Sequence, residues 1–290
     1  MRRRLRRTGR TRSLLRALMS IIWAYAWIVP TVIALKLDPV IATLTLTVLI
    51  AAFIARNVVR PLRSQPRRAA QLRLRPVHGY LPWLTLAVGV KLVLVVSTVV
   101  LHEQLATWRL LPRLPDDPDF VSAAFLAHPF GLIALLLAAA ILGPLIEEFA
   151  FRGRMLHDLE HSIGVVPAIV LTGTVFSLMH GTLDAVHHLV FGIFAGWVVW
   201  RTGSIWSGVY MHCLNNAAAV ALVRLTSDWN PSERPPPAWL WPYAVVAGVL
   251  AIGALLLVAR FIHRAAQHTR PRASAWSRER PAQPAMTLAL

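Results

Sequence analysis

Apolar residues fill long stretches of the chain, and shorter segments rich in arginine, proline or acidic residues separate them. A helix needs about 20 mainly apolar residues to cross the hydrocarbon core of a bilayer. Several stretches approach this length, near residues 14–35, 40–57, 80–101, 126–150, 164–182, 185–201, 204–225 and 240–262. The pattern therefore predicts an all-α fold, a polytopic transmembrane helical bundle of about eight helices.

The composition agrees with a membrane protein. The 290 residues are 56% hydrophobic and 15% charged, with a mean hydropathy of +0.56, as is typical of polytopic membrane proteins. Residues 1–12 are expected to be disordered. The predicted organisation is a basic cytoplasmic tail (1–13), N-terminal transmembrane helices and connections (14–125), a helical core that holds the candidate chemistry (126–225), an outer loop with the last transmembrane helix (226–265) and a disordered basic C-terminal tail (266–290).

The net charge of +17 is compatible with nucleic-acid binding, but the distribution of arginine favours a membrane orientation. Arginines cluster in residues 1–12, 56–76 and 152–154 and again after Arg260. With eight crossings, these clusters fall on one side of the membrane, and the acidic connection 102–120 falls on the other. The positive-inside rule then predicts that both termini are cytoplasmic, in a multi-pass protein of the cell (inner or plasma) membrane. The expected partners are membrane lipids, and nucleic acid is not expected.

Two adjacent carboxylates end a nearly pure apolar run, in "IEEFAFRGRM". Ionisable groups inside membrane helices are costly and are by default functional candidates. Glu148 and Arg152 are four residues apart, in the order that favours a helical ion pair. Glu147 lies about 100° around the helix from Glu148, so the two carboxylates do not need to share a partner.

Two further pairs have helical spacing in apolar surroundings: Phe176 with His180 in "FSLMH", and His212 with Asn216 in "HCLNN". If the chain turns near residue 163, the next helix returns antiparallel and residue 179 faces Glu147. His180 should then meet Glu147 at one depth, as an acid–base pair or as two metal ligands. Residues 164–201 are short for two crossings, so the turn at 181–184 is expected below the outer surface, facing a cavity.

Each polar group also has a structural interpretation. One interpretation of Glu148–Arg152 is an interfacial ion pair at a helix end, and a structural role is favoured for Arg152. His212 and Asn216 are also suited to hydrogen bonds between helices. Lys91 is expected to snorkel or to make a polar contact within the bundle. His187 and His188 are expected at headgroup level or behind the site.

The segments "EEFAFR", "FSLMH" and "RTGSIWSGVYMHCLNN", in this order, resemble the CPBP intramembrane protease family. That family includes CAAX prenyl endopeptidases and bacteriocin-processing and abortive-infection proteins. Its motifs are E-E-x-x-x-R, F-x-x-x-H and H-x-x-x-N or D, and all are present within about residues 126–220. The core at 126–225 is therefore interpreted as a CPBP-like catalytic core.

The resemblance implies a membrane-embedded endopeptidase that hydrolyses peptide bonds of membrane-associated protein or peptide substrates. Glu147, assisted by His180, would activate a water, and His212 and Asn216 would stabilise the oxyanion. Glu148 and Arg152 would support them. Glu147, His180 and His212 would also suit zinc, and we favour a mechanism without a tightly bound metal.

Other peptidase mechanisms fit the sequence less well. "HEQLA", from His102, lacks the second histidine of H-E-x-x-H and is expected in the outer connection. Cys213 points about 100° away from His212 and is a poor nucleophile candidate. The alternative from another class is a non-catalytic membrane scaffold, a chaperone-like partner or a transporter on the same helices. Gly192 and Gly196 allow close helix packing, within one bundle or between subunits.

Overall fold

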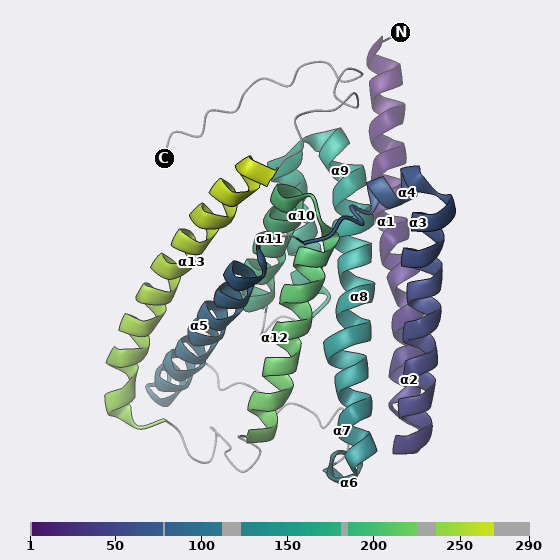
Figure 1. Ribbon diagram of the computed structural model, residues 1–290. Helices are drawn as coiled ribbons and strands as arrows, with labels where there is room; N and C mark the ends of the chain where they lie inside the picture. The colour runs from purple at the N-terminus through teal and green to yellow at the C-terminus, as the bar shows by residue number, and fades with distance from the viewer. Residues whose placement is uncertain (1, 78, 112–122, 181–184, 226–235, 270–290) are drawn as a thin grey trace.

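The computed structural model describes residues 2–77, 79–111, 123–180, 185–225 and 236–269, and the regular structure of these residues is helical (Figure 1). The elements are α1 (Arg2–Ala34), α2 (Pro39–Ile54), η1 (Ala55–Val59), α3 (Arg60–Ser64), α4 (Pro66–Gln71), α5 (Leu81–Thr107), α6 (Ala123–Ala127), α7 (Pro129–Leu135), η2 (Leu136–Leu142), α8 (Gly143–Glu148), η3 (Phe149–Met155), α9 (Leu156–Ile163), α10 (Val165–Leu178), α11 (Ala185–Thr202), α12 (Ile205–Leu225), η4 (Ala238–Leu240) and α13 (Trp241–Thr269).

The predicted all-α membrane bundle is confirmed, because helical structure occupies each predicted apolar stretch and the described residues form no strand. In the described part of the chain, five helical segments are long and apolar enough to cross a membrane: Ser13–Ala34, Pro39–Ser64, Leu81–Thr107, Pro129–Ile163 and Ala238–Gln267. The chain is therefore a multi-pass membrane protein, and the count of eight crossings stays a prediction.

Helix α10 is too short to cross a bilayer by itself. Its 14 residues extend about 21 Å at 1.5 Å per residue. This length agrees with a turn below the surface, although residues 181–184 lie outside the described residues.

The central element is the continuous helix α7–η2–α8–η3–α9, which buries a larger share of its apolar window than the other candidate spans. Two of its segments, η2 and η3, are π-helical and flank α8. Pro144, in the first turn of α8, has no N–H and cannot complete an α-helical bond to the preceding turn. The N–H of Gly143 accordingly bonds to Ala138 O, five residues back. Such π-segments are frequent at functional sites.

A turn at Gly164 reverses the chain after α9. Its φ of +89° is costly for a residue with a Cβ and ordinary for glycine. Helix α10 then packs on α11 at a close crossing, where a Cβ on Gly173 would meet Ile193 N at 2.9 Å. Gly192 packs on Gly173 and Gly196 packs on Ile169. The close packing predicted for Gly192 and Gly196 therefore occurs inside the bundle.

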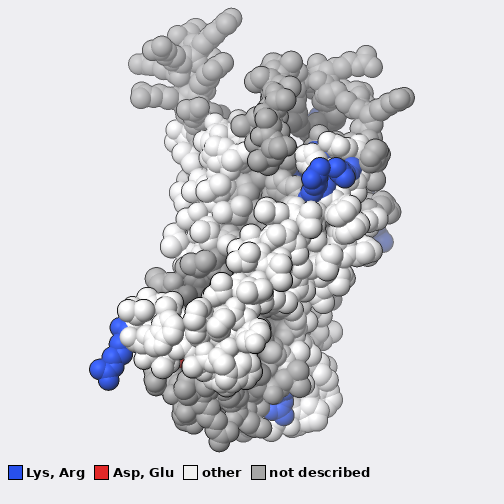
Figure 2. Space-filling view, turned by 90° about the vertical axis from the view of Figure 1, so that its left-hand side faces the viewer, with Lys and Arg blue, Asp and Glu red and all other residues white. Residues whose placement is uncertain are grey.

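The arginine clusters lie at one end of the molecule. The first turns of α1, together with α4, α9 and the last turns of α13, lie at the upper end in Figure 1. On the face that Figure 2 shows, blue and red atoms are few between the two ends. Large apolar side chains of α13 are exposed, including Leu250, Leu256 and Leu257. A helix face of this kind is suited to lipid.

We expect cysteine labelling to place α4 in the cytoplasm. Arg67 is exposed on α4, so in a Cys213→Ala background Arg67→Cys should react with a reagent confined to the cytoplasmic side. Glu233→Cys, in the predicted outer loop outside the described residues, should react only from the opposite side. Strong cytoplasmic labelling at position 233 would contradict the topology.

Three sequence expectations are wrong. Residues 2–12 were expected to be disordered but form the first turns of α1, because arginine and leucine are good helix formers that extend an apolar helix. The "HEQLA" segment was expected in a connection but belongs to α5, where Glu103 and Gln104 are buried. Residues 266–269 likewise continue α13. The rest of the predicted C-terminal tail, the outer loop at 226–235 and residues 112–122 lie outside the described residues.

Candidate active site

Glu147 and Glu148 lie at the end of α8, and their environments differ. The side chain of Glu147 is 18% exposed, and that of Glu148 is fully buried. Because the two residues are adjacent on a helix, their side chains point in different directions, so one carboxylate is partly exposed and the other lies in the protein interior. The accessible carboxylate is suited to act on a substrate, and the buried one is suited to hold its neighbours.

Glu148 forms a buried ion pair with Arg152, at 2.9 Å between Oε1 and Nη1. Arg152 is also fully buried, donates from Nη2 to Gly192 O at 3.1 Å, and lies 4.6 Å from the centre of the Phe176 ring. The ion pair is therefore internal to the helical bundle. Arg152 links the central helix to α11 and gives the buried carboxylate of Glu148 a partner of opposite charge.

His180 lies just after α10, in hydrogen-bonding contact with the backbone of its own helix. Its Nδ1 is 2.8 Å from Phe176 O. A carbonyl only accepts, so Nδ1 carries the proton and, in the neutral ring, Nε2 carries the lone pair. Nε2 lies 3.7 Å from Glu147 Oε2. The predicted meeting of Glu147 and His180 is confirmed.

His212, on α12, contacts both carboxylates. Its Nδ1 is 3.0 Å from Glu148 Oε1, and its Nε2 is 3.5 Å from Glu147 Oε2. Glu148 accepts in its ion pair with Arg152, so it also accepts from His212 Nδ1–H. The sequence motifs did not reveal this second role of Glu148, as the anchor that orients His212.

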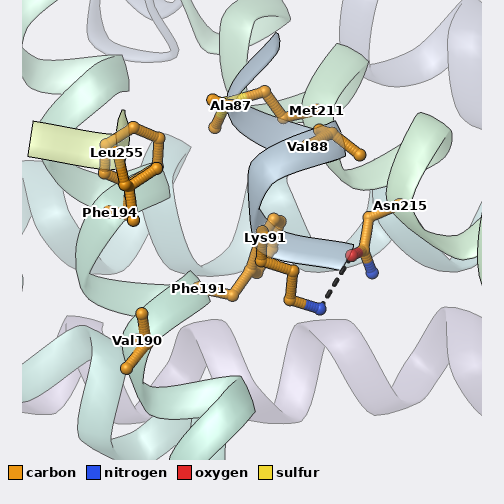
Figure 3. Close-up of a pocket in the computed structure, with 9 residues that line it drawn as sticks. All are labelled: Ala87, Val88, Lys91, Val190, Phe191, Phe194, Met211, Asn215 and Leu255. Atoms are coloured by element: carbon orange, nitrogen blue, oxygen red, sulfur yellow. Dashed lines mark hydrogen bonds between the residues drawn. The ribbon is translucent and has the colours of Figure 1, made fainter. Parts of the chain in front are cut away.

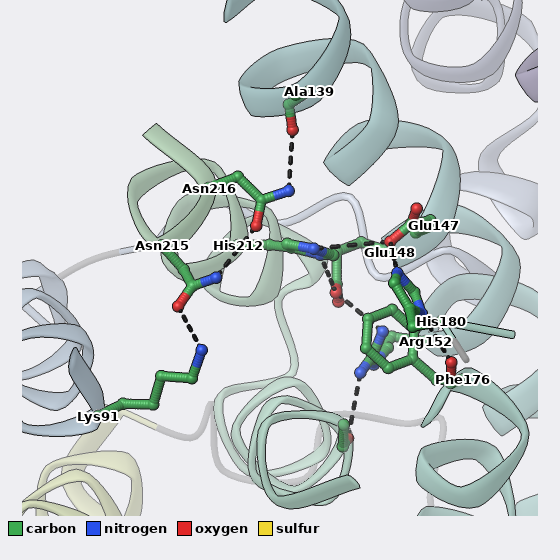
Figure 4. A network of polar contacts seen from close by, with 11 residues as sticks. Lys91, Ala139, Glu147, Glu148, Arg152, Phe176, His180, His212, Asn215 and Asn216 are labelled. Carbon is green, nitrogen blue, oxygen red and sulfur yellow. Dashed lines mark hydrogen bonds and ion pairs between the residues drawn. The ribbon is translucent and has the colours of Figure 1, made fainter. Parts of the chain in front are cut away.

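Both imidazoles thus direct Nε2 towards one atom, Glu147 Oε2 (Figure 4). This oxygen is buried and has no hydrogen-bond donor among the described residues. The separations of 3.5 and 3.7 Å exceed a direct hydrogen bond, and a water in contact with the groups could bridge them.

Asn216 belongs to a second part of the polar network. Its Nδ2 donates to Ala139 O at 2.8 Å, and its Oδ1 accepts from Asn215 Nδ2 at 3.0 Å. Asn215 Oδ1 in turn accepts from Lys91 Nζ at 2.7 Å (Figures 3 and 4). The expected polar contact of Lys91 within the bundle is confirmed. Asn215 was not predicted as a site residue. Its only signal in the sequence is that it precedes Asn216 in an apolar helix.

The neighbouring histidines differ in placement. The ring of His188 stacks on His180, with centroids 4.3 Å apart, and so borders the site. His187 Nε2 lies 3.0 Å from Thr98 Oγ1 on α5. His188 therefore lies behind His180 as expected, and His187 turns towards another helix.

Gly208 allows α12 to approach Glu148. A Cβ at this position would overlap Glu148 Oε2 and lie 2.8 Å from Val199 Cγ2. We expect Gly208→Ala to destabilise the protein by about 1–3 kcal/mol, as overpacking does, and to displace Glu148 from His212. The melting temperature in detergent measures this effect. Gly253→Ala is the matched control, because a Cβ there meets nothing within 4 Å. Equal melting temperatures for the two variants would contradict the packing argument.

The carboxylate and two imidazoles also have the chemistry of zinc ligands. Zinc accepts carboxylate oxygen and imidazole nitrogen, and Glu147 Oε2 lies within 3.7 Å of both Nε2 atoms. Glu147, His180 and His212 would hold such an ion, as predicted for the metal alternative. His212, which donates Nδ1–H to Glu148, would have the usual outer partner of a metal-bound histidine.

Comparison with protein families gives one match that covers the site. The model of the type II CAAX prenyl endopeptidase Rce1-like family matches residues 129–218. This range contains Glu147, Glu148, Arg152, His180, His212 and Asn216. No curated protein and no solved structure gives a significant match to the chain.

Proposed function

Because residues 129–218 match the model of the type II CAAX prenyl endopeptidase Rce1-like family, we propose that the chain is an intramembrane endopeptidase of the CPBP type. Its substrates are peptide bonds of membrane-associated proteins or peptides. The observation that carries this proposal is the convergence of two imidazole Nε2 atoms on the unpaired Oε2 of the accessible carboxylate Glu147.

Glu147 acts as the general base. It takes a proton from a water held between its Oε2 and His180 Nε2, and the water oxygen attacks the carbonyl carbon of the scissile bond. His180 accepts a hydrogen bond from this water through Nε2, since its Nδ1–H is committed to Phe176 O. Glu147 then returns the proton to the leaving nitrogen as the carbon–nitrogen bond breaks. The reaction consumes one water and yields a new carboxylate and a new amine.

His212 stabilises the negative charge on the carbonyl oxygen. As an imidazolium it donates Nε2–H to this oxygen, while its Nδ1–H stays on Glu148. Glu148 holds the ring in this orientation through its contact with Nδ1 at 3.0 Å. Asn216 contributes the amide hydrogen that it does not use on Ala139.

The catalytic group works in this proposal without a tightly bound metal. If zinc were bound by Glu147, His180 and His212, it would polarise the carbonyl and the attacking water. Each step above needs only the protein side chains and water. Membrane lipid is the surrounding partner, and the proposed location is the cell membrane with both termini in the cytoplasm.

Peptide cleavage by detergent-purified protein tests the function. A library of membrane-associated peptides should yield fragments with the wild-type protein and none with Glu147→Ala. Binding of peptides without cleavage would favour the scaffold or chaperone-like alternative. Passage of a solute across reconstituted vesicles without cleavage would favour a transporter.

A further inference from the structure

A second group of titratable side chains lies on α9, outside the catalytic group. His157, Glu160 and His161 are spaced i, i+3 and i+4 and share one helix face. One candidate ligand atom from each lies within 4.8 Å of the others. Among the residues that the structure describes, no other set of three His, Cys, Asp or Glu side chains is grouped so closely. The three side chains are between 13% and 47% exposed, so a solute can reach them.

His161 is oriented as metal-bound histidines commonly are. Its Nδ1 lies 2.7 Å from His157 O, which only accepts, so Nδ1 carries the proton. In the neutral ring Nε2 then carries the lone pair, and the side chain is 47% exposed. Donation of the second ring N–H to a backbone carbonyl is a usual outer-shell contact of a histidine ligand. The His157 and His161 rings lie 4.8 Å apart, close enough to share one ion.

Arg73 holds Glu160 in place. Its Nη2 lies 2.8 and 2.7 Å from Glu160 Oε1 and Oε2. An ionised carboxylate offers about four lone-pair positions, so this contact leaves acceptor capacity for an ion. Oε1 is also the oxygen that faces both histidines, at 3.8 Å from His157 Nδ1 and 3.9 Å from His161 Nδ1.

We propose that His157, Glu160 and His161 bind a divalent transition-metal ion of the zinc class at the arginine-rich end of the molecule. Two imidazoles and one carboxylate form a common three-residue zinc ligand set, with water in the fourth position. The spacing H-x-x-E-H also occurs in zinc peptidases, where the glutamate is a base. Here Arg73 contacts both oxygens of Glu160, which leaves neither free to act as a base. Glu160 therefore serves as a metal ligand, and the site binds an ion without catalysing a reaction.

The position of this site connects it to both catalytic helices. Helix α9 continues directly from η3 and α8, which carries Glu147 and Glu148. Arg73 O accepts a hydrogen bond from Ile205 N, at the start of α12, which carries His212. An ion that fixes Glu160 therefore also fixes the contact between these two helices at the membrane surface, and it should raise the melting temperature by mass action.

Zinc titration of the purified full chain, followed by calorimetry and by melting temperature, tests the proposal. The wild type should bind about one equivalent and melt at a higher temperature with zinc. His157→Ala/His161→Ala should weaken binding by about tenfold or more and abolish the zinc-dependent rise. If the double variant does not fold, zinc binding is measured with His161→Gln, which keeps a polar side chain.

Two control variants locate the ion. His180→Ala removes a catalytic histidine, and His263→Ala removes an exposed histidine on α13 at the same end of the molecule. Both should bind zinc like the wild type. The proposal would be overturned if the His157/His161 variants bound zinc like the wild type, or if His180→Ala lost binding. It would also be overturned if the wild type did not bind zinc at tens of micromolar.

Discussion

Glu147→Gln is expected to lower the turnover number by a hundredfold or more, with a small change in KM. The glutamine keeps the shape of the side chain and its partial exposure, but it cannot take a proton from water. Loss of a general base commonly costs factors of about 10²–10⁴. Steady-state kinetics on a peptide that the wild-type protein cleaves measure the effect.

Glu148→Gln is the matched control for the carboxylate pair. Glu148 is fully buried and paired with Arg152 and His212. Its replacement should therefore lower the melting temperature, because Arg152 loses its buried counter-charge, whereas Glu147→Gln should leave the melting temperature nearly unchanged. If Glu147→Gln retained turnover and Glu148→Gln abolished it in folded protein, the base assignment would be wrong.

His212→Asn is expected to lower the turnover number by about 10²–10³, as loss of one oxyanion donor does. The asparagine amide can occupy the place of Nδ1 and keep the bond to Glu148, but it has no group at the place of Nε2. The interaction with the oxyanion forms only in the transition state, so KM should change little.

His212→Gln makes the opposite change and serves as the comparison. Its amide can reach the place of Nε2, but the Nδ1 contact to Glu148 at 3.0 Å is lost. This variant should melt at a lower temperature than His212→Asn and retain more turnover. If His212→Asn lowered stability alone, His212 would serve only to join α12 to α8. For Asn216→Ala, the helix-joining role predicts a stability loss of about 0.6 kcal/mol without a loss of turnover.

Much of the fold could be predicted from the chain, because membrane helices are determined by local apolar composition. The stretches predicted near 164–182, 185–201 and 204–225 correspond to α10, α11 and α12. Helix ends were less predictable. Glu103 and Gln104 looked like residues of a connection, but neighbouring helices bury them in α5, and no local pattern encodes that burial.

In the site, too, a contact between consecutive helices could be predicted, and contacts between distant helices could not. The contact of Glu147 with His180 followed from a single turn between consecutive antiparallel helices, and Gly164 provides that turn. The contact of Glu148 with His212 joins residues 64 positions apart, and the close approach of α12 at Gly208 determines it. The bond from Lys91 to Asn215 spans 124 positions. Such contacts depend on the packing of whole helices, which periodicity does not specify.

The most direct test of the central proposal is hydrolysis of a membrane-associated peptide in water enriched in ¹⁸O, followed by mass spectrometry of both fragments. The account predicts internal cleavage, with one ¹⁸O in the new carboxylate after a single turnover, an unlabelled new amine, and no fragments from Glu147→Ala. Cleavage of equal extent by Glu147→Ala, or no cleavage of any membrane-associated peptide by folded wild-type protein, would contradict it.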